Sequence, residues 1–227
     1  MGIIVGGTRL QGLRYGNTEI IKRMVGDQQI WPPVQMVSYV GSTIYLAATG
    51  SFNTHAVGDL LVVAAISSTA NVPSLPAGWN NAYTSADGAN LPVRLGWKIA
   101  TAANSSNQNW TGASYLTTYV FRGANTSAPF GALCSQAQSN TKAPVSPAFT
   151  PINNAGESLM VHSYVNNGNS GSPGTYAPPG FIAKNRNARI INNMRLDSTL
   201  GNPVAEYHSG GNLAAWRMLV FEVVPSS

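Results

Sequence analysis

The sequence predicts an all-β protein, with a small N-terminal β-meander repeat followed by a jelly-roll-like β-sandwich built from two similar halves. Turn dipeptides centred on glycine recur every ten residues near the N-terminus. Further along, apolar strand-like runs alternate with polar loops, and three landmarks of the first half return in the second. From residue 37 to the end, no stretch has a helical period. We therefore expect two regions, residues 1–36 and residues 37–227.

The first region contains a short internal repeat. Gly6, Gly16 and Gly26 are spaced by ten residues, and each is followed by Gly, Asn or Asp. Such dipeptides favour two-residue hairpin turns. The pattern predicts a meander of four short strands that ends at Trp31, because the two prolines that follow cannot continue a ladder.

A segment of this size cannot bury a core by itself. We therefore expect it to attach to another protein through its apolar side chains, its basic side chains and its open strand edges. The residues expected at this assembly interface are Val5, Arg14, Tyr15, Arg23, Val25 and Trp31.

Six runs in the second region predict strands. The stretch DLLVVAAIS (residues 59–67) is continuously apolar, which is typical of a strand inside a sandwich. The other five runs are VRLGWKIA, SYLTTYVFR, SLMVHSYV, ARIINNMRL and AWRMLVFEVV.

These runs predict a repeat. The landmarks Gly58, Gly78 and Phe121 correspond to Gly156, Gly180 and Phe221, at offsets of 98, 102 and 100 residues. We expect two similar antiparallel halves, about 37–124 and 156–227, whose inward faces close over one core. The segment 123–155, rich in Ser, Ala, Pro and Asn, is then the crossing between the halves.

Composition narrows the classes of function. Only 9% of the residues are charged, against roughly 25% in an average soluble domain. Thirteen basic and eight acidic residues give a net charge of +5, which suits an acidic partner. The basic residues are scattered and are not interleaved with aromatics, so nucleic-acid binding is not expected. Membrane insertion is not expected either, because no apolar run approaches the ~18 residues of a membrane helix. The single Cys134 is expected to be a small buried side chain.

The sequence predicts no enzyme, no catalytic residue and no cofactor. It has no nucleophile elbow, P-loop or dinucleotide fingerprint. A glycosidase would need two carboxylates facing a cleft. Asp59 and Glu157 open corresponding strands, where solvation at a strand edge accounts for them, while Asp197 and Glu206 are the least explained acids.

The histidines predict no metal site, because none has the spacing of metal ligands. His162 lies inside an apolar run and is expected to be packed and hydrogen-bonded. Glu206 and His208 share one face if their stretch is a strand, and surface pairing explains them.

Aromatic side chains divide into two groups. Trp79, Trp97, Phe181 and Trp216 follow glycine or lie in strand runs, so core packing is expected for them. The candidates for ligand contact, which lie in or beside polar loops, are Trp110, Tyr83, Tyr176 and Tyr207.

Several motifs resemble those of a known class of proteins. The glycine-turn repeat that ends in QQIWPP resembles the start of minor tail proteins of phages that infect actinobacteria and related hosts. The stretches GDLLVVAAISS, LPAGW, RLGWKIATAANSSNQNW and YVFRGA are similar to the sandwich domain of such tail and adhesin proteins. The resemblance implies a location in the virion, in the tail rather than on the capsid surface. It also implies a structural or adhesion role, other virion proteins as partners and a homo-oligomer.

Three alternatives stay open. A carbohydrate-binding module would recognise host cell-wall glycan through a shallow groove of exposed rings. A head-decoration protein would be a variant of the structural role. An envelope-degrading enzyme would need a cleft that holds Asp197 or Glu206 beside another acid. The N-terminus MGIIVGGTRLQ lacks a signal-peptide pattern, which we expect of a protein released by host lysis.

Overall fold

The computed structural model describes residues 14–15, 18–19, 23–25, 28–31, 36–85, 91–103, 108–139, 150–152, 158–166, 182–186, 190–195 and 215–226. Within these ranges the elements are all β-strands, so the predicted all-β class is confirmed there. The described residues contain no helix able to cross a membrane. The chain divides into one compact unit of residues 1–35 with residue 227, and a second of residues 36–226.

The N-terminal unit contains two antiparallel hairpins. Strand β1 (Arg14–Tyr15) pairs with β2 (Thr18–Glu19), and β3 (Arg23–Val25) pairs with β4 (Gln28–Trp31). In both hairpins two residues separate the paired ends, at positions 16–17 and 26–27, where the sequence predicts turns.

The rest of the predicted meander is not seen in the described residues. The two hairpins are separate two-stranded sheets there, whereas we expected four strands in succession. The third predicted turn, at residues 6–7, lies outside the described residues, as does Val5. Of the other expected interface residues (Arg14, Tyr15, Arg23, Val25 and Trp31) the structure describes the backbone alone.

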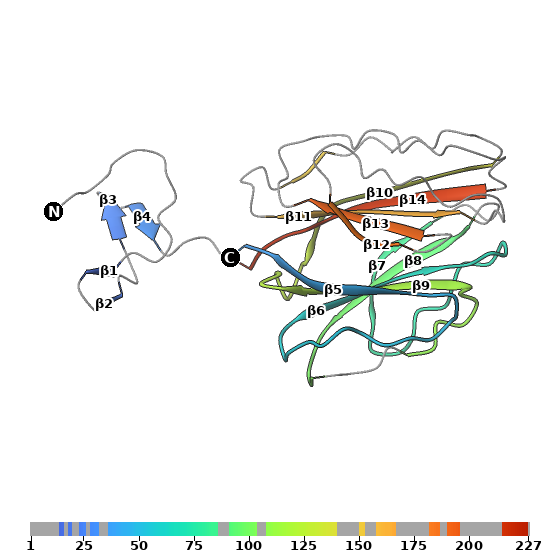
Figure 1. Cartoon of the computed structure of the whole chain (residues 1–227), viewed down its shortest axis with the longest axis horizontal. Coiled ribbons are helices and arrows are strands. Elements are labelled where there is room, and N and C mark those ends of the chain that lie inside the picture. Colours follow the sequence, from blue (N-terminus) through green and yellow to red (C-terminus); the bar gives the residue numbers. More distant parts are fainter. Residues whose placement is uncertain are drawn as a thin grey trace. The chain divides into compact units, whose positions relative to one another are not determined.

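The first half of the second unit folds into one five-stranded antiparallel sheet (Figure 1). Its order is β5-β9-β6-β8-β7. The strands are β5 (Ser38–Tyr45), β6 (Leu60–Ile66), β7 (Asn80–Thr84), β8 (Val93–Ile99) and β9 (Tyr115–Arg122). All seven residues of the central strand β6 are buried. This burial on both faces is the reason for its continuous apolar sequence.

The second sheet has the same strand order as the first, β10-β14-β11-β13-β12. Its strands are β10 (Phe130–Ser139), β11 (Leu159–Asn166), β12 (Ile182–Arg186), β13 (Ile190–Arg195) and β14 (Ala215–Val223). In each sheet both edge strands carry one extra residue relative to their neighbour. These four bulges lie within 39–41, 81–83, 130–133 and 183–185.

The two sheets form the layers of a sandwich over one core (Figure 1). The inward residues of both sheets, from Leu60 and Tyr119 to Val161 and Phe221, belong to a single apolar cluster. The rings of Tyr119 and Phe221 meet edge to face across the interior, with their centroids 5.7 Å apart. Strand β12 contacts β5 at one side of the sandwich. The last strand of the second sheet order thus lies beside the first strand of the first sheet order, so the two strand orders run in opposite directions.

Four strands were not predicted, and one of them corrects the expected crossing between the halves. The unexpected strands are β5, β7, β10 and β12. Because β10 lies within segment 123–155, the second sheet begins at Phe130 and not near residue 156. Each sheet is made from one continuous stretch of chain, so the likeness to a jelly roll extends only to the two layers.

The landmarks of the predicted repeat do not share one register. In the first sheet Phe121 pairs with Leu60, and in the second Phe221 pairs with Val161. Leu60 and Val161 are 101 residues apart, whereas the landmark glycines Gly58 and Gly156 are 98 apart. When the two sheets are aligned so that Phe121 matches Phe221 and Leu60 matches Val161, Gly58 falls three residues after Gly156.

Candidate functional site

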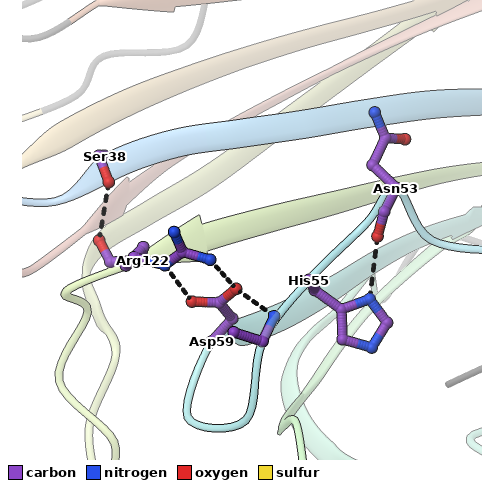
Figure 2. A network of polar contacts seen from close by, with 6 residues as sticks. Ser38, Asn53, His55, Asp59 and Arg122 are labelled. Carbon is purple, nitrogen blue, oxygen red and sulfur yellow. Dashed lines mark hydrogen bonds and ion pairs between the residues drawn. The ribbon is translucent and has the colours of Figure 1, made fainter. Parts of the chain in front are cut away.

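The clearest polar cluster of the sandwich surrounds Asp59, at the start of β6 (Figure 2). Gly58, with a φ of +89°, allows the tight turn that brings the carboxylate back over Ala56. Asp59 Oδ2 accepts the Ala56 N–H at 2.8 Å and Arg122 Nη2 at 2.8 Å, while Oδ1 accepts Arg122 Nε at 2.8 Å. The Asp59 side chain is 3% exposed and that of Arg122 is 55% exposed.

The electrostatics of this cluster favour an ion pair at neutral pH. Burial favours a higher pKa for Asp59, but the hydrogen bonds from Arg122 and Ala56 and the Arg122 charge outweigh it and lower the pKa. Asp59 therefore stays ionised and ties the turn before β6 to the end of β9. The expectation that strand-edge solvation accounts for Asp59 is wrong, because its partner Arg122 lies 63 positions away along the chain.

The neighbouring loop is fixed by short polar contacts. His55 Nδ1 lies 2.9 Å from the Asn53 carbonyl oxygen, and Thr43 Oγ1 donates to Asn53 Oδ1 at 2.6 Å. Ser38 Oγ donates to the carbonyl oxygen of Arg122 at 3.5 Å. Thr43 thus joins the 53–59 loop to β5, and Ser38 joins β5 to β9, which are structural roles. Figure 2 shows the Ser38 and His55 contacts.

Glu222 makes a second brace, in β14. The fully buried carboxylate accepts the Ala132 N–H at 3.1 Å, the Ile152 N–H at 2.8 Å and Ser158 Oγ at 2.7 Å. The glycine at 131 makes room for it, since a Cβ there would lie 2.3 Å from Oε2. Both acids of the sandwich whose side chains are described thus hold structural hydrogen bonds. The other acids in question, Glu157, Asp197 and Glu206, lie outside the described residues, as does His208.

A third polar group crosses the interior between the sheets. Arg217 of β14 is 1% exposed and donates from Nε to the Leu91 carbonyl and from Nη1 to Ser135 Oγ at 3.1 Å. The Tyr83 hydroxyl is hydrogen-bonded to the same Ser135. Tyr83, a candidate for ligand contact, is half-buried and joins the edge strands β7 and β10 through this bond.

Trp110 also differs from its predicted role. Its side chain is 0% exposed and covers the outer face of the first sheet, where its ring meets Trp79 edge to face at 5.1 Å. Phe52 stacks on Trp79 at 6.0 Å, and Lys98 Nζ lies 4.8 Å from the Trp79 ring centroid. Trp110 is thus a core residue and not an exposed ring, because Gly96 beneath it leaves space for the indole.

The structure describes some of the other aromatic residues for which the sequence predicts a role. Trp79 and Trp216 are buried, and Trp97 packs against the core between the sheets, as expected. Tyr176 and Tyr207, the remaining candidates for ligand contact, lie outside the described residues together with Phe181.

His162 is fully buried in β11, where it pairs across the ladder with Val220 on one side and Asn193 on the other. In the described part of the chain, no three His, Cys, Asp or Glu residues lie close enough to hold a metal ion.

No protein-family model, curated protein or solved structure matches the chain. The resemblance to minor tail proteins of phages therefore stays a prediction.

Proposed function

We propose that this chain is a structural or adhesion component of a bacteriophage virion, a minor tail protein that displays a β-sandwich and is not an enzyme. The proposal rests on one observation, that the buried ionisable side chains described in the sandwich make structural contacts. Asp59, Glu222 and Arg217 all hold backbone or side-chain groups that join separate elements. A glycosidase would instead present a pair of carboxylates to a cleft.

The division of the chain supports an attachment role for residues 1–36. The N-terminal unit has its own contacts, and its described strands are only two to four residues long. Hairpins this short have little apolar surface to bury among themselves. A neighbouring virion protein that pairs with their edges would supply the missing contacts.

We infer also that the sandwich is a duplication of one five-stranded unit. Support comes from the identical strand order of the two sheets and from the bulges that occur in all four edge strands. The opposite stacking of the sheets is the arrangement of two copies related by a local two-fold axis.

The proposal is tested on particles. Antibodies against the chain should label tails of purified particles in electron micrographs, and mass spectrometry should find the chain in the same particles. Absence of the chain from the particles would contradict the virion role, and labelling of heads would favour head decoration instead.

The attachment role needs a separate variant. Deletion of residues 1–36 should leave the sandwich with an unchanged circular dichroism spectrum and melting transition but exclude it from particles. Normal incorporation of the shortened chain would refute an attachment role for this segment.

The non-enzymatic role is tested with purified bacterial cell wall. Incubation with the full chain should release neither sugars nor peptides. Release that Asp197→Asn or Glu206→Gln abolishes would show that the chain is a wall hydrolase.

A further inference from the structure

The outer face of β8 carries two cations in one row. Val93 and Leu95 point into the core between the sheets, so Arg94, Gly96 and Lys98 alternate with them on the opposite face. The two cations are four residues apart, about 13 Å along a strand. Both are partly exposed.

Arg94 is held in place by two uncharged acceptors. Its Nε donates to the Pro73 carbonyl at 2.6 Å, and its Nη1 donates to Asn81 Oδ1 at 3.2 Å. Asn81 Oδ1 also accepts Thr84 Oγ1 at 3.0 Å. Both β7 residues are exposed, so an amide and a hydroxyl lie beside a guanidinium that is already oriented.

Lys98 packs over a buried aromatic ring. Its Nζ lies over the ring of Trp79, which packs against Trp110. Trp110 lies over Gly96, so close that a Cβ there would be 2.4 Å from the indole. The buried Trp110 side chain therefore covers the outer face of β8 between the two cations.

The charges of the row are not neutralised by the described part of the sandwich. The acids described there, Asp59 and Glu222, are buried, and their carboxylates are engaged elsewhere. Burial lowers the pKa of Lys98, because desolvation disfavours its charged form. Two oriented cations beside exposed amide and hydroxyl groups match a ligand with repeated negative charges and sugar hydroxyls.

We propose that Arg94 and Lys98, together with Asn81 and Thr84, bind an anionic polysaccharide that carries phosphate or carboxylate groups. The inference rests on the adhesion role proposed above and names the class of ligand, an anionic polymer of the bacterial wall. A single-stranded nucleic acid fits less well, because its bases need exposed rings for stacking and Trp110 is fully buried.

The test uses the purified full chain and four immobilised probes: polyglycerol phosphate, polygalacturonate, neutral dextran and a single-stranded oligonucleotide. We expect binding to at least one acidic polysaccharide, no binding to dextran, and weaker binding to the oligonucleotide. The phosphate and carboxylate probes distinguish the two sources of charge. Because isolated protein is used, the outcome does not depend on whether the chain is found in particles.

The decisive variant is the double substitution Arg94→Gln with Lys98→Gln. It should weaken binding about tenfold or more and flatten the salt dependence. The control Lys184→Gln removes one cation of the other sheet, which also lies over a ring, that of Tyr39, and should change binding less than about twofold. Unchanged melting transitions would show that both variants are folded. Equal losses in the two variants, stronger binding to the oligonucleotide, or no binding to either acidic polysaccharide would each refute the proposal.

Discussion

At the scale of single residues, the described ionisable groups of the sandwich act mainly as braces. Asp59 holds a turn through one backbone N–H and a two-pronged contact with Arg122, and Glu222 holds three separate donors. A buried carboxylate is tolerated when its lone pairs are satisfied in this way. The low overall content of charged residues is consistent with a protein that uses its few charges to fix loops.

The Asp59–Arg122 pair predicts a pH-dependent stability. The folded state lowers the pKa of Asp59, so its stabilising effect is present above the unfolded pKa of about 3.9 and is lost as the pH falls through the lower folded value. Arg122→Gln should therefore reduce the free energy of unfolding at pH 7 and reduce it less near pH 3. Urea denaturation at both pH values measures the difference.

The control for this prediction is Lys184→Gln, which removes an exposed cation that lies over the Tyr39 ring. Its small effect should be the same at both pH values. A deficit of Arg122→Gln that does not change with pH would mean that Asp59 is not the group that titrates.

Gly96 predicts a steric effect on the outer face of the first sheet. A Cβ at this position would lie 2.4 Å from the Trp110 ring and 3.0 Å from a Leu75 methyl group. Gly96→Ala should destabilise the fold by about 1–3 kcal/mol, because the indole must move within a packed cluster. In a Trp110→Phe background the same substitution should cost clearly less. Equal costs in both backgrounds, measured by thermal denaturation, would contradict this packing.

At the scale of elements, central and edge strands differ in how well the sequence predicts them. The six predicted runs correspond to β6, β8, β9, β11, β13 and β14, which are the three central strands of each sheet. The four unpredicted strands are the edges. An edge strand has one unpaired side, and sequences such as NNAYT and FGALCSQAQS are polar or built of small residues, so they resemble loops.

The bulges explain a further part of this difference. Each edge strand has one extra residue against its neighbour, which shifts the alternation of inward and outward side chains partway along the strand. A pattern search for strict alternation therefore fails on these strands. Bulges at sheet edges also discourage unwanted pairing with other chains.

The contact between β7 and β10 predicts energetic coupling between the sheets. Tyr83 and Ser135 share a hydrogen bond, and Ser135 also accepts from Arg217. In a double-mutant cycle, Tyr83→Phe and Ser135→Ala should show a coupling free energy of about 0.5–1.5 kcal/mol. The same cycle with Thr84→Val in place of Tyr83→Phe is the control and should be additive. Additive effects of Tyr83→Phe and Ser135→Ala would mean that the bond contributes nothing.

At the scale of the whole sandwich, one core joins the two sheets. Tyr119 of the first sheet contacts Phe221 of the second, and its buried hydroxyl, whose pKa is raised by burial, is hydrogen-bonded to Ser163. Neither sheet can therefore cover its inward face by itself. Burial of this face supplies the main part of the stability of both halves.

This shared core predicts that residues 37–124 do not form a stable monomer. The fragment would expose the inward faces of β6 and β9, whose residues include Leu60, Val62 and Phe121. Urea denaturation should give no cooperative transition, whereas residues 36–226 should unfold in one transition. Analytical ultracentrifugation separates this outcome from self-association. A monomeric fragment that unfolds cooperatively would contradict the shared core.

The all-β class, the central strands and the two N-terminal hairpins are predicted correctly from the sequence, because they depend on local signals. Continuous apolar runs and glycine-turn dipeptides act within a few residues of the chain. Long-range contacts, which the structure reveals, set which strands form the edges, where the second sheet begins and how the landmark phenylalanines pair. They also set the roles of Asp59, Tyr83 and Trp110, because their partners Arg122, Ser135 and Trp79 lie far away in sequence. Contacts between distant residues leave no local pattern. The polar composition around Trp110 therefore suggested an exposed ring, whereas the fold buries it.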